Sequence, residues 1–159
     1  MALDPSALKT QLDQGWLSAS FPDTAQISAD RFASAVAMWF SAAQAAGFPC
    51  STATARQSQL SGLLVAALAS GSAVSAAQGL ASALAAYMTG QVFGAGIAAA
   101  PLGTSAAAAA FTTALSDLSP QTPNALRAQS LATACQALAL TVIVTFPPST
   151  PPIPPSPVV

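Results

Sequence analysis

The sequence contains no histidine and no glutamate, and it is poor in charge throughout. Four cations and five aspartates give a net charge of −1 over 159 residues, whereas an ordinary soluble domain is roughly a quarter charged. From Gln57 to Ser116, 60 consecutive residues carry no charged side chain. Much of this surface is therefore expected to meet something other than bulk water, which favours a subunit of a larger assembly over a free monomer.

These absences remove most catalytic chemistry. Without histidine there is no Ser-His-Asp or Cys-His arrangement and no His-based metal site. Without glutamate, EF-hand loops and most paired-carboxylate hydrolase schemes are excluded. The five aspartates show no ligand spacing and are interpreted as helix caps or solvated positions; a Ser/Lys arrangement with Lys9 as base is the formal exception. We expect a protein that is not an enzyme and has no metal ion, no cofactor and no small-molecule substrate.

The same composition bears on partners and location. Four scattered cations give no electrostatic footprint for nucleic acid. A membrane span is disfavoured, because serine and glycine interrupt every apolar window and no basic residue lies between Arg56 and Arg127 to anchor an end. Residues 1–5 show no basic or apolar region of a cleaved signal. Cys50 and Cys135 lack metal or redox spacing, so buried small apolar residues are favoured over a disulfide.

The chain is rich in alanine, with 40 copies, and shows a weak internal repeat. A nine-residue motif that begins at Phe32 recurs from Leu80 and from Leu131, at offsets of 48 and 51 residues. The same offsets relate three apolar triplets with helical i, i+4, i+7 spacing, which begin at Leu12, Leu60 and Phe111. The repeat predicts three helix–turn–helix units.

The predicted fold is all-α, a bundle of about six helices arranged as three helical hairpins. The units span about 4–47, 52–89 and 104–139, within one alanine-rich helical domain over 1–139. Asp4 followed by Pro5 is a typical helix start, and Ser28 is the predicted cap of the second helix. With so few bulky side chains, the helices are expected to approach closely and the free subunit to be only marginally stable.

Residues 140–159 differ from this pattern. Residues 140–146 are β-branched and aromatic with alternating faces, which predicts one short strand; the alternative is an extension of the last helix. A proline-rich stretch follows, with prolines every third residue, as in an extended polyproline II tail; the alternative is a disordered tail. Because a lone strand leaves unpaired backbone groups, we expect residues 140–159 to be an arm that docks by strand addition. Its predicted interface residues are Val142, Val144, Phe146, Pro151, Ile153 and Pro154.

The capped N-terminal helix, the alanine-rich helical body and the proline-rich tail together resemble small structural proteins of tailed-bacteriophage virions, of the neck, tail or baseplate type. The resemblance implies a structural role, a location in the virion, and partners that are other structural proteins in a symmetric homo-oligomer or ring. The alternative is a secreted or surface-exposed interaction protein that associates with membrane. The main rival resemblance is to alanine-rich mycobacterial surface proteins of the PE/PPE kind. The chain lacks the Pro-Glu and Pro-Pro-Glu signatures that define those proteins, since it contains no glutamate.

Overall fold

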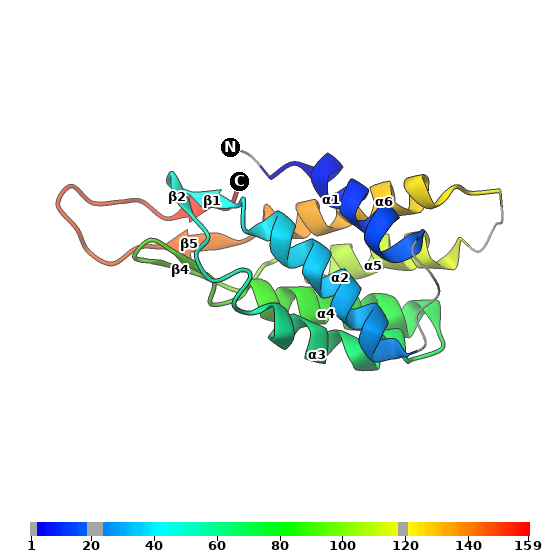
Figure 1. The fold of residues 1–159 in the computed structure, drawn as a ribbon. Helices are drawn as coiled ribbons and strands as arrows, with labels where there is room; N and C mark the ends of the chain where they lie inside the picture. Colours follow the sequence, from blue (N-terminus) through cyan, green and yellow to red (C-terminus); the bar gives the residue numbers. More distant parts are fainter. Residues whose placement is uncertain (1–2, 19–23, 118–120) are drawn as a thin grey trace.

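A computed structural model of the chain describes residues 3–18, 24–117 and 121–159. The described part is helix-rich, as predicted, and Figure 1 shows the helices lying side by side with short strands at one end. The first helix continues into a π-helical turn, η1, at Asp13–Leu17. Six α-helices are present in these residues: α1 Pro5–Leu12, α2 Ala25–Phe40, α3 Gln57–Leu68, α4 Ala73–Met88, α5 Thr104–Ser116 and α6 Asn124–Ala139.

Local capping explains where the helices begin. The Asp4 carboxylate accepts a hydrogen bond from the Ser6 amide at 2.8 Å, and proline occupies the first turn, as expected for α1. The prediction that Ser28 caps the second helix is wrong. The Thr24 hydroxyl accepts from the Ile27 amide instead, so α2 begins one turn earlier and the Ser28 hydroxyl accepts from the Trp16 indole at 2.8 Å.

Contacts between the helices close into a circuit. Each of α1 to α5 packs against the helix that follows it in the chain, and α6 packs against α1. α2, α4 and α6 bury seven or eight residues each, whereas α1, α3 and α5 bury two to four. Phe32, Leu80 and Leu131 are buried on the three more enclosed helices.

The prediction of a single strand is wrong, because six short strands lie in the described residues. They are β1 Gln44–Ala45, β2 Phe48–Pro49, β3 Val92–Phe93, β4 Gly96–Ala98, β5 Ile143–Thr145 and β6 Ser156–Pro157. β1 pairs with β2, and β3, β4, β5 and β6 pair in that order, always antiparallel. The strands are too short to produce an alternating pattern in the sequence.

Two further contacts join these sheets. Cys50, directly after β2, forms an antiparallel bridge with Phe93 in β3. At the other side, Gln44 and Val159 exchange both backbone hydrogen bonds, each 2.9 Å long. Each strand therefore has a neighbour on both sides, and β1 to β6 with Cys50 and Val159 form a closed circuit, called the strand ring below. In the part of the chain that the structure describes, closure leaves no free strand edge of the kind that the predicted strand addition requires.

Two of the three strand hairpins have tight turns. Ala46 and Gly47 link β1 to β2 with φ values of 51° and 83°, both left-handed, as in a type I′ turn. β3 and β4 are also joined by two residues, the first of which is Gly94 with φ 61°, as in a type II′ turn. These turns match the natural twist of paired strands.

The strand ring shares one core with the helices. Val144 and Val158 are fully buried and belong to the same apolar cluster as the helical residues. Phe40 at the end of α2 connects the two parts, with its ring centroid 6.3 Å from that of Phe93 and 5.9 Å from that of Tyr87. Strand β5 and residues 156–159 are therefore packed against the body, which corrects the expectation that all of residues 140–159 form an arm with a lone strand.

We predict that Phe111→Ala lowers the free energy of unfolding by about 3–5 kcal/mol, because the side chain is fully buried on α5. Denaturant unfolding followed by circular dichroism measures this. Leu126→Ala is the control, since that side chain is 58 % exposed on α6, and its effect is expected to stay within about 0.5 kcal/mol. Equal effects of the two changes would contradict the assignment of Phe111 to the core.

Two helical glycines provide a second, matched prediction. A Cβ on Gly79 in α4 would lie 2.5 Å from the Ala67 Cβ of α3, whereas a Cβ on Gly62 meets nothing within 4 Å. Gly79→Ala is therefore expected to destabilise the protein by about 1–3 kcal/mol through overpacking. Gly62→Ala is expected to stabilise it by about 0.5–1 kcal/mol. Shifts of the same sign in the unfolding midpoint would show that close approach of α3 and α4 is not required.

Candidate assembly surface

The described residues contain no constellation typical of catalysis or metal binding. No three or more His, Cys, Asp or Glu side chains come together there to hold a metal ion. No helix in the described part of the chain has the length and apolar character of a membrane span. A hollow of about 360 Å³ between η1 and α2 has Arg31 as the one charged side chain among its lining residues, so it offers no acid–base pair.

A buried polar cluster lies where the helices meet the strand ring. The Gln91 side chain is fully buried; its amide nitrogen donates to the Tyr87 carbonyl at 3.0 Å, and its amide oxygen accepts from the Thr52 hydroxyl. The Tyr87 hydroxyl donates to the Ala53 carbonyl at 2.8 Å. Because buried polar groups are costly when unpaired, these bonds fix the segment after β2 against the start of β3. We assign them a structural role.

Arg56 is the charged residue next to this junction in the chain. Its guanidinium donates to the Thr89 carbonyl at 2.7 Å, at the C-terminal end of α4. A cation at this end of a helix is stabilised by the helix dipole and satisfies a carbonyl that has no partner within the helix. The role of this charge is therefore also structural.

Both cysteines are buried and unpaired, as predicted. Burial is the largest effect on each thiol: it raises the pKa of Cys50 and raises the pKa of Cys135 to about 12. The Cys50 thiol also lies 3.5 Å from the Gln91 amide oxygen. Since the thiolate is the nucleophile, neither cysteine is a reactive group at neutral pH.

We predict that neither thiol reacts with a disulfide reagent in the folded protein at mildly alkaline pH, while both react at once in denaturant. Burial raises the pKa of both thiols, that of Cys135 to about 12, so both favour the protonated form and are shielded from the reagent. A time course of thiol labelling, read by intact-protein mass spectrometry, measures this. Rapid labelling of one thiol in the native state would show that the segment covering it opens.

The strand ring and its connections form a chargeless end of the molecule. No charged residue occurs in residues 41–55, 89–103 or 140–159. Ile97 and Ile143 are 56 % and 37 % exposed. Because Ile97 pairs with Thr145, two residues after Ile143, both isoleucines point to the outer face of the sheet. An apolar outer face without charge is typical of surfaces buried in stable protein–protein contacts.

Two leucines add to the exposed apolar surface at the base of the strands. Leu102 is 86 % exposed and Leu140 is 47 % exposed. The segments that carry them lie together, because the Gly103 amide donates to the Thr141 hydroxyl at 3.1 Å. The name outer face below refers to Ile97, Ile143, Leu102 and Leu140.

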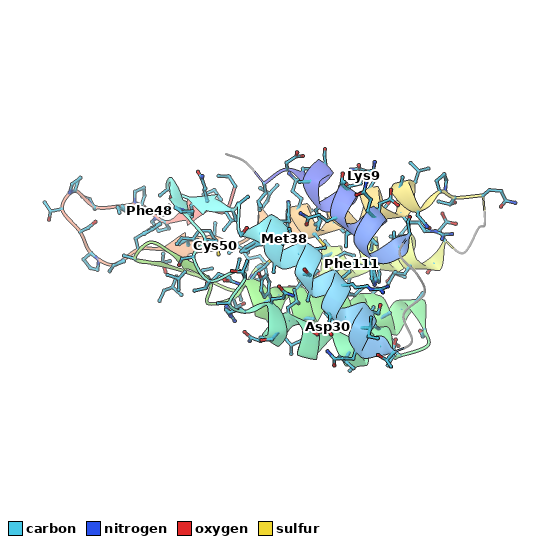
Figure 2. The ribbon with its side chains drawn as sticks, viewed as in Figure 1. Lys9, Asp30, Met38, Phe48, Cys50 and Phe111 are labelled. Atoms are coloured by element: carbon cyan, nitrogen blue, oxygen red, sulfur yellow. The ribbon has the colours of Figure 1, made fainter. Side chains whose placement is uncertain are left out.

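Two aromatic side chains of the strand ring and its connections also pack together. The rings of Phe48 and Phe146 lie 5.7 Å apart. Each rests on a glycine of the middle hairpin: a Cβ on Gly94 would lie 2.7 Å from Phe48, and one on Gly96 would lie 2.6 Å from Phe146. Figure 2 shows Phe48 among the strands, while Lys9 and Asp30 lie over the helices.

The structure separates the residues that were predicted to form one interface. Val142 and Val144 are fully buried in the chain's own core, so their side chains are not presented to a partner in this conformation. Phe146 and Ile153 are partly buried, and Pro151 and Pro154 are exposed. The predicted docking through Val142, Val144 and Phe146 of a lone strand therefore does not match this structure, because β5 already pairs with β4 and β6.

Sequence reasoning assigned none of the outer-face residues to an interface. Ile97 and Leu102 lie between the predicted helical units, Leu140 begins the predicted strand, and Ile143 lies on the face of that strand opposite the assigned one. The repeat offset is a signal that finds part of this face. Advancing the two predicted offsets from Gln44 reaches Val92 and then Ile143, so the three residues are the first residues of β1, β3 and β5.

Comparison of the chain with protein-family models, curated proteins and solved structures finds no match.

Proposed function

We propose that this chain is a non-enzymatic structural subunit of a multi-protein assembly, of the kind found in the neck, tail or baseplate of a tailed-phage virion. The observation that carries the proposal is the chargeless strand end with its exposed outer face. A subunit that remains free in solution gains from surface charge, which keeps proteins soluble and apart. Residues 41–55, 89–103 and 140–159, which form the strand end, carry no charged side chain, and this end is suited to burial against other structural proteins.

The proposal includes a threefold repeat of helix, helix and strand hairpin, packed as one helical bundle. The starts of α2, α4 and α6 at residues 25, 73 and 124 support it, since these are 48 and 51 residues apart. β1, β3 and β5 begin at residues 44, 92 and 143, with the same spacing. Such a unit presents similar surfaces around one axis, a geometry suited to a component of symmetric particles.

The absence of suitable chemistry also favours a structural role. The buried polar groups described above bond to the protein's own backbone and side chains, and the two thiols are enclosed. The proposed partners are other structural proteins, including further copies of this chain. Nucleic acid and small-molecule substrates are not part of the proposal.

We predict that the purified chain has a solution mass well above the 15.6 kDa of one copy, and that Ile97→Asp lowers this mass. The charge would be desolvated in the buried interface, which is costly without a partner. Sedimentation velocity measures the mass, with circular dichroism as a test of folding. Leu126→Asp is the matched control, because Leu126 is 58 % exposed but lies on α6 rather than on the outer face.

The location is tested separately, by mass spectrometry and immunogold electron microscopy of purified phage particles from the source. A fixed ratio to known particle proteins is the expected result. Recovery with detergent-solubilised membranes or cell wall, and none with particles, would instead support a surface-exposed interaction protein. A folded monomer that stays unassociated at high concentration and accompanies no particle protein would contradict the proposed function.

A further inference from the structure

Residues 156–159 form the segment that closes the strand ring. β6 pairs with β5 through Ser156 and Pro157, and the Val158 amide donates to the Val142 carbonyl at 3.1 Å. The Val158 side chain is fully buried. Val159 then completes the circuit through its two hydrogen bonds with Gln44. Residues 156–159 thus fill a slot between β5 and β1, held by backbone bonds on both sides and by one apolar anchor.

The connection that leads to this segment differs from the other two hairpin connections. Two residues join β1 to β2 and two join β3 to β4, whereas the ten residues 146–155 separate β5 from β6. Six of these ten residues are proline. Figure 1 shows the connection extending past the strands, away from the helices.

This connection is also only weakly attached to the rest of the molecule. Within the described residues, the hydrogen bonds found for residues 147–155 stay inside the connection or reach Ser156: the Ser149 hydroxyl donates to the Pro151 carbonyl, and the Ser156 hydroxyl donates to the Pro154 carbonyl. Its attachment to the body is through the strands at each end and the partly buried Phe146 and Ile153. At about 3.1 Å per residue, nine extended residues span roughly 28 Å. A connection of that length allows residues 156–159 to lie outside the molecule that carries them.

We propose that residues 156–159 exchange between copies of this chain, so that the segment of one copy fills the slot between β5 and β1 of a neighbour. The proposal rests on the proposed function and names how copies are joined. Closed and exchanged states contain the same strand pairs and the same buried Val158, so their energies differ mainly in the connection. A two-residue turn forces a strand back onto its own partner, but a stiff, proline-rich ten-residue connection does not.

The strand edges and the apolar cavity of the slot determine which segment fits it. If residues 156–159 leave, β5 and β1 each expose an unpaired edge and the cavity of Val158 is empty. Refilling by an identical segment restores every bond and the packing of the valine, whereas an unrelated strand supplies only the backbone bonds. A second copy of this chain is therefore the partner that fits.

The test uses two full-length single variants, Gln44→Cys and Val159→Cys, expressed together in one cell. Residues that exchange both hydrogen bonds across antiparallel strands have Cα atoms about 5.5 Å apart, which suits a disulfide. Because the two new cysteines are on different chains, a 44–159 disulfide forms only when the segment of one copy occupies the slot of another. After mild oxidation, we expect a disulfide-linked dimer that yields this cross-linked peptide in mass spectrometry.

The matched control replaces residues 146–154 with Asn-Gly in both chains, which places Thr145 opposite Pro155, keeps the Val144–Ser156 pairing and forms a two-residue hairpin like the other two. Loss of the 44–159 cross-link, with circular dichroism unchanged, is the expected result. The Gln44→Cys/Val159→Cys double variant shows whether the disulfide geometry is adequate, because it cross-links within one chain in the closed state. An intrachain disulfide there and none between the single variants would overturn the exchange.

The outcomes also separate this inference from the proposed function. A multimer that is sensitive to Ile97→Asp but gives no interchain 44–159 cross-link leaves the structural role intact and refutes the exchange. An interchain cross-link in a protein that accompanies no particle component supports the exchange and refutes the location in a virion. A cross-link of equal yield with and without the long connection would show random collision, and it would refute the exchange as well.

Discussion

Close approach of helices through small side chains is the constraint on which the rest of this structure depends. Alanine buries little apolar area, so stability must come from many short contacts between backbones rather than from a few large side chains. The glycine at position 79, set against Ala67, shows how little space remains between α3 and α4. Three of the larger buried residues, Phe40, Tyr87 and Phe93, lie in contact where the helices meet the strand ring. These aromatic contacts join the helices to the strand ring.

The strand ring solves a problem that such a helical body creates. The last backbone carbonyls of a helix have no partner within the helix. A core built from small side chains also offers the connecting segments little apolar surface to pack against. Here the connections after α2, α4 and α6 each become a strand hairpin, and the three hairpins satisfy one another's backbone groups. The buried amide of Gln91 joins this ring to the helices by side-chain bonds. Polar pairing at this end thus adds to the apolar packing of Phe93, Val144 and Val158.

The helices were predictable from the sequence, and most of the strands were not. Asp4 and Pro5 mark a helix start through well-understood capping, and apolar spacing places Phe32, Leu80 and Leu131 on inward faces. Strands of two or three residues carry no periodic signal, so none of β1 to β4 was predicted: β1 lies within the predicted helical unit 4–47, and β3 and β4 lie between the predicted units 52–89 and 104–139. The strand at residues 143–145 was found because its neighbours are β-branched, but its partners lie far away in the chain, at Gly96–Ala98 and Ser156–Pro157. Local pattern predicts which segments extend, whereas pairing depends on contacts that only the folded body creates.

The order of synthesis gives the closing contact between Gln44 and Val159 a further consequence. These residues are far apart in the sequence, so their pairing carries one of the largest loop-closure costs in the fold and is expected late in folding. On the ribosome, β1 to β5 emerge before residues 156–159, and the ring stays open until those residues leave the exit tunnel. Neighbouring nascent chains on one messenger RNA would then display open rings and newly released closing segments side by side. Polysome spacing and the rate of translation would thereby influence which chain closes which ring.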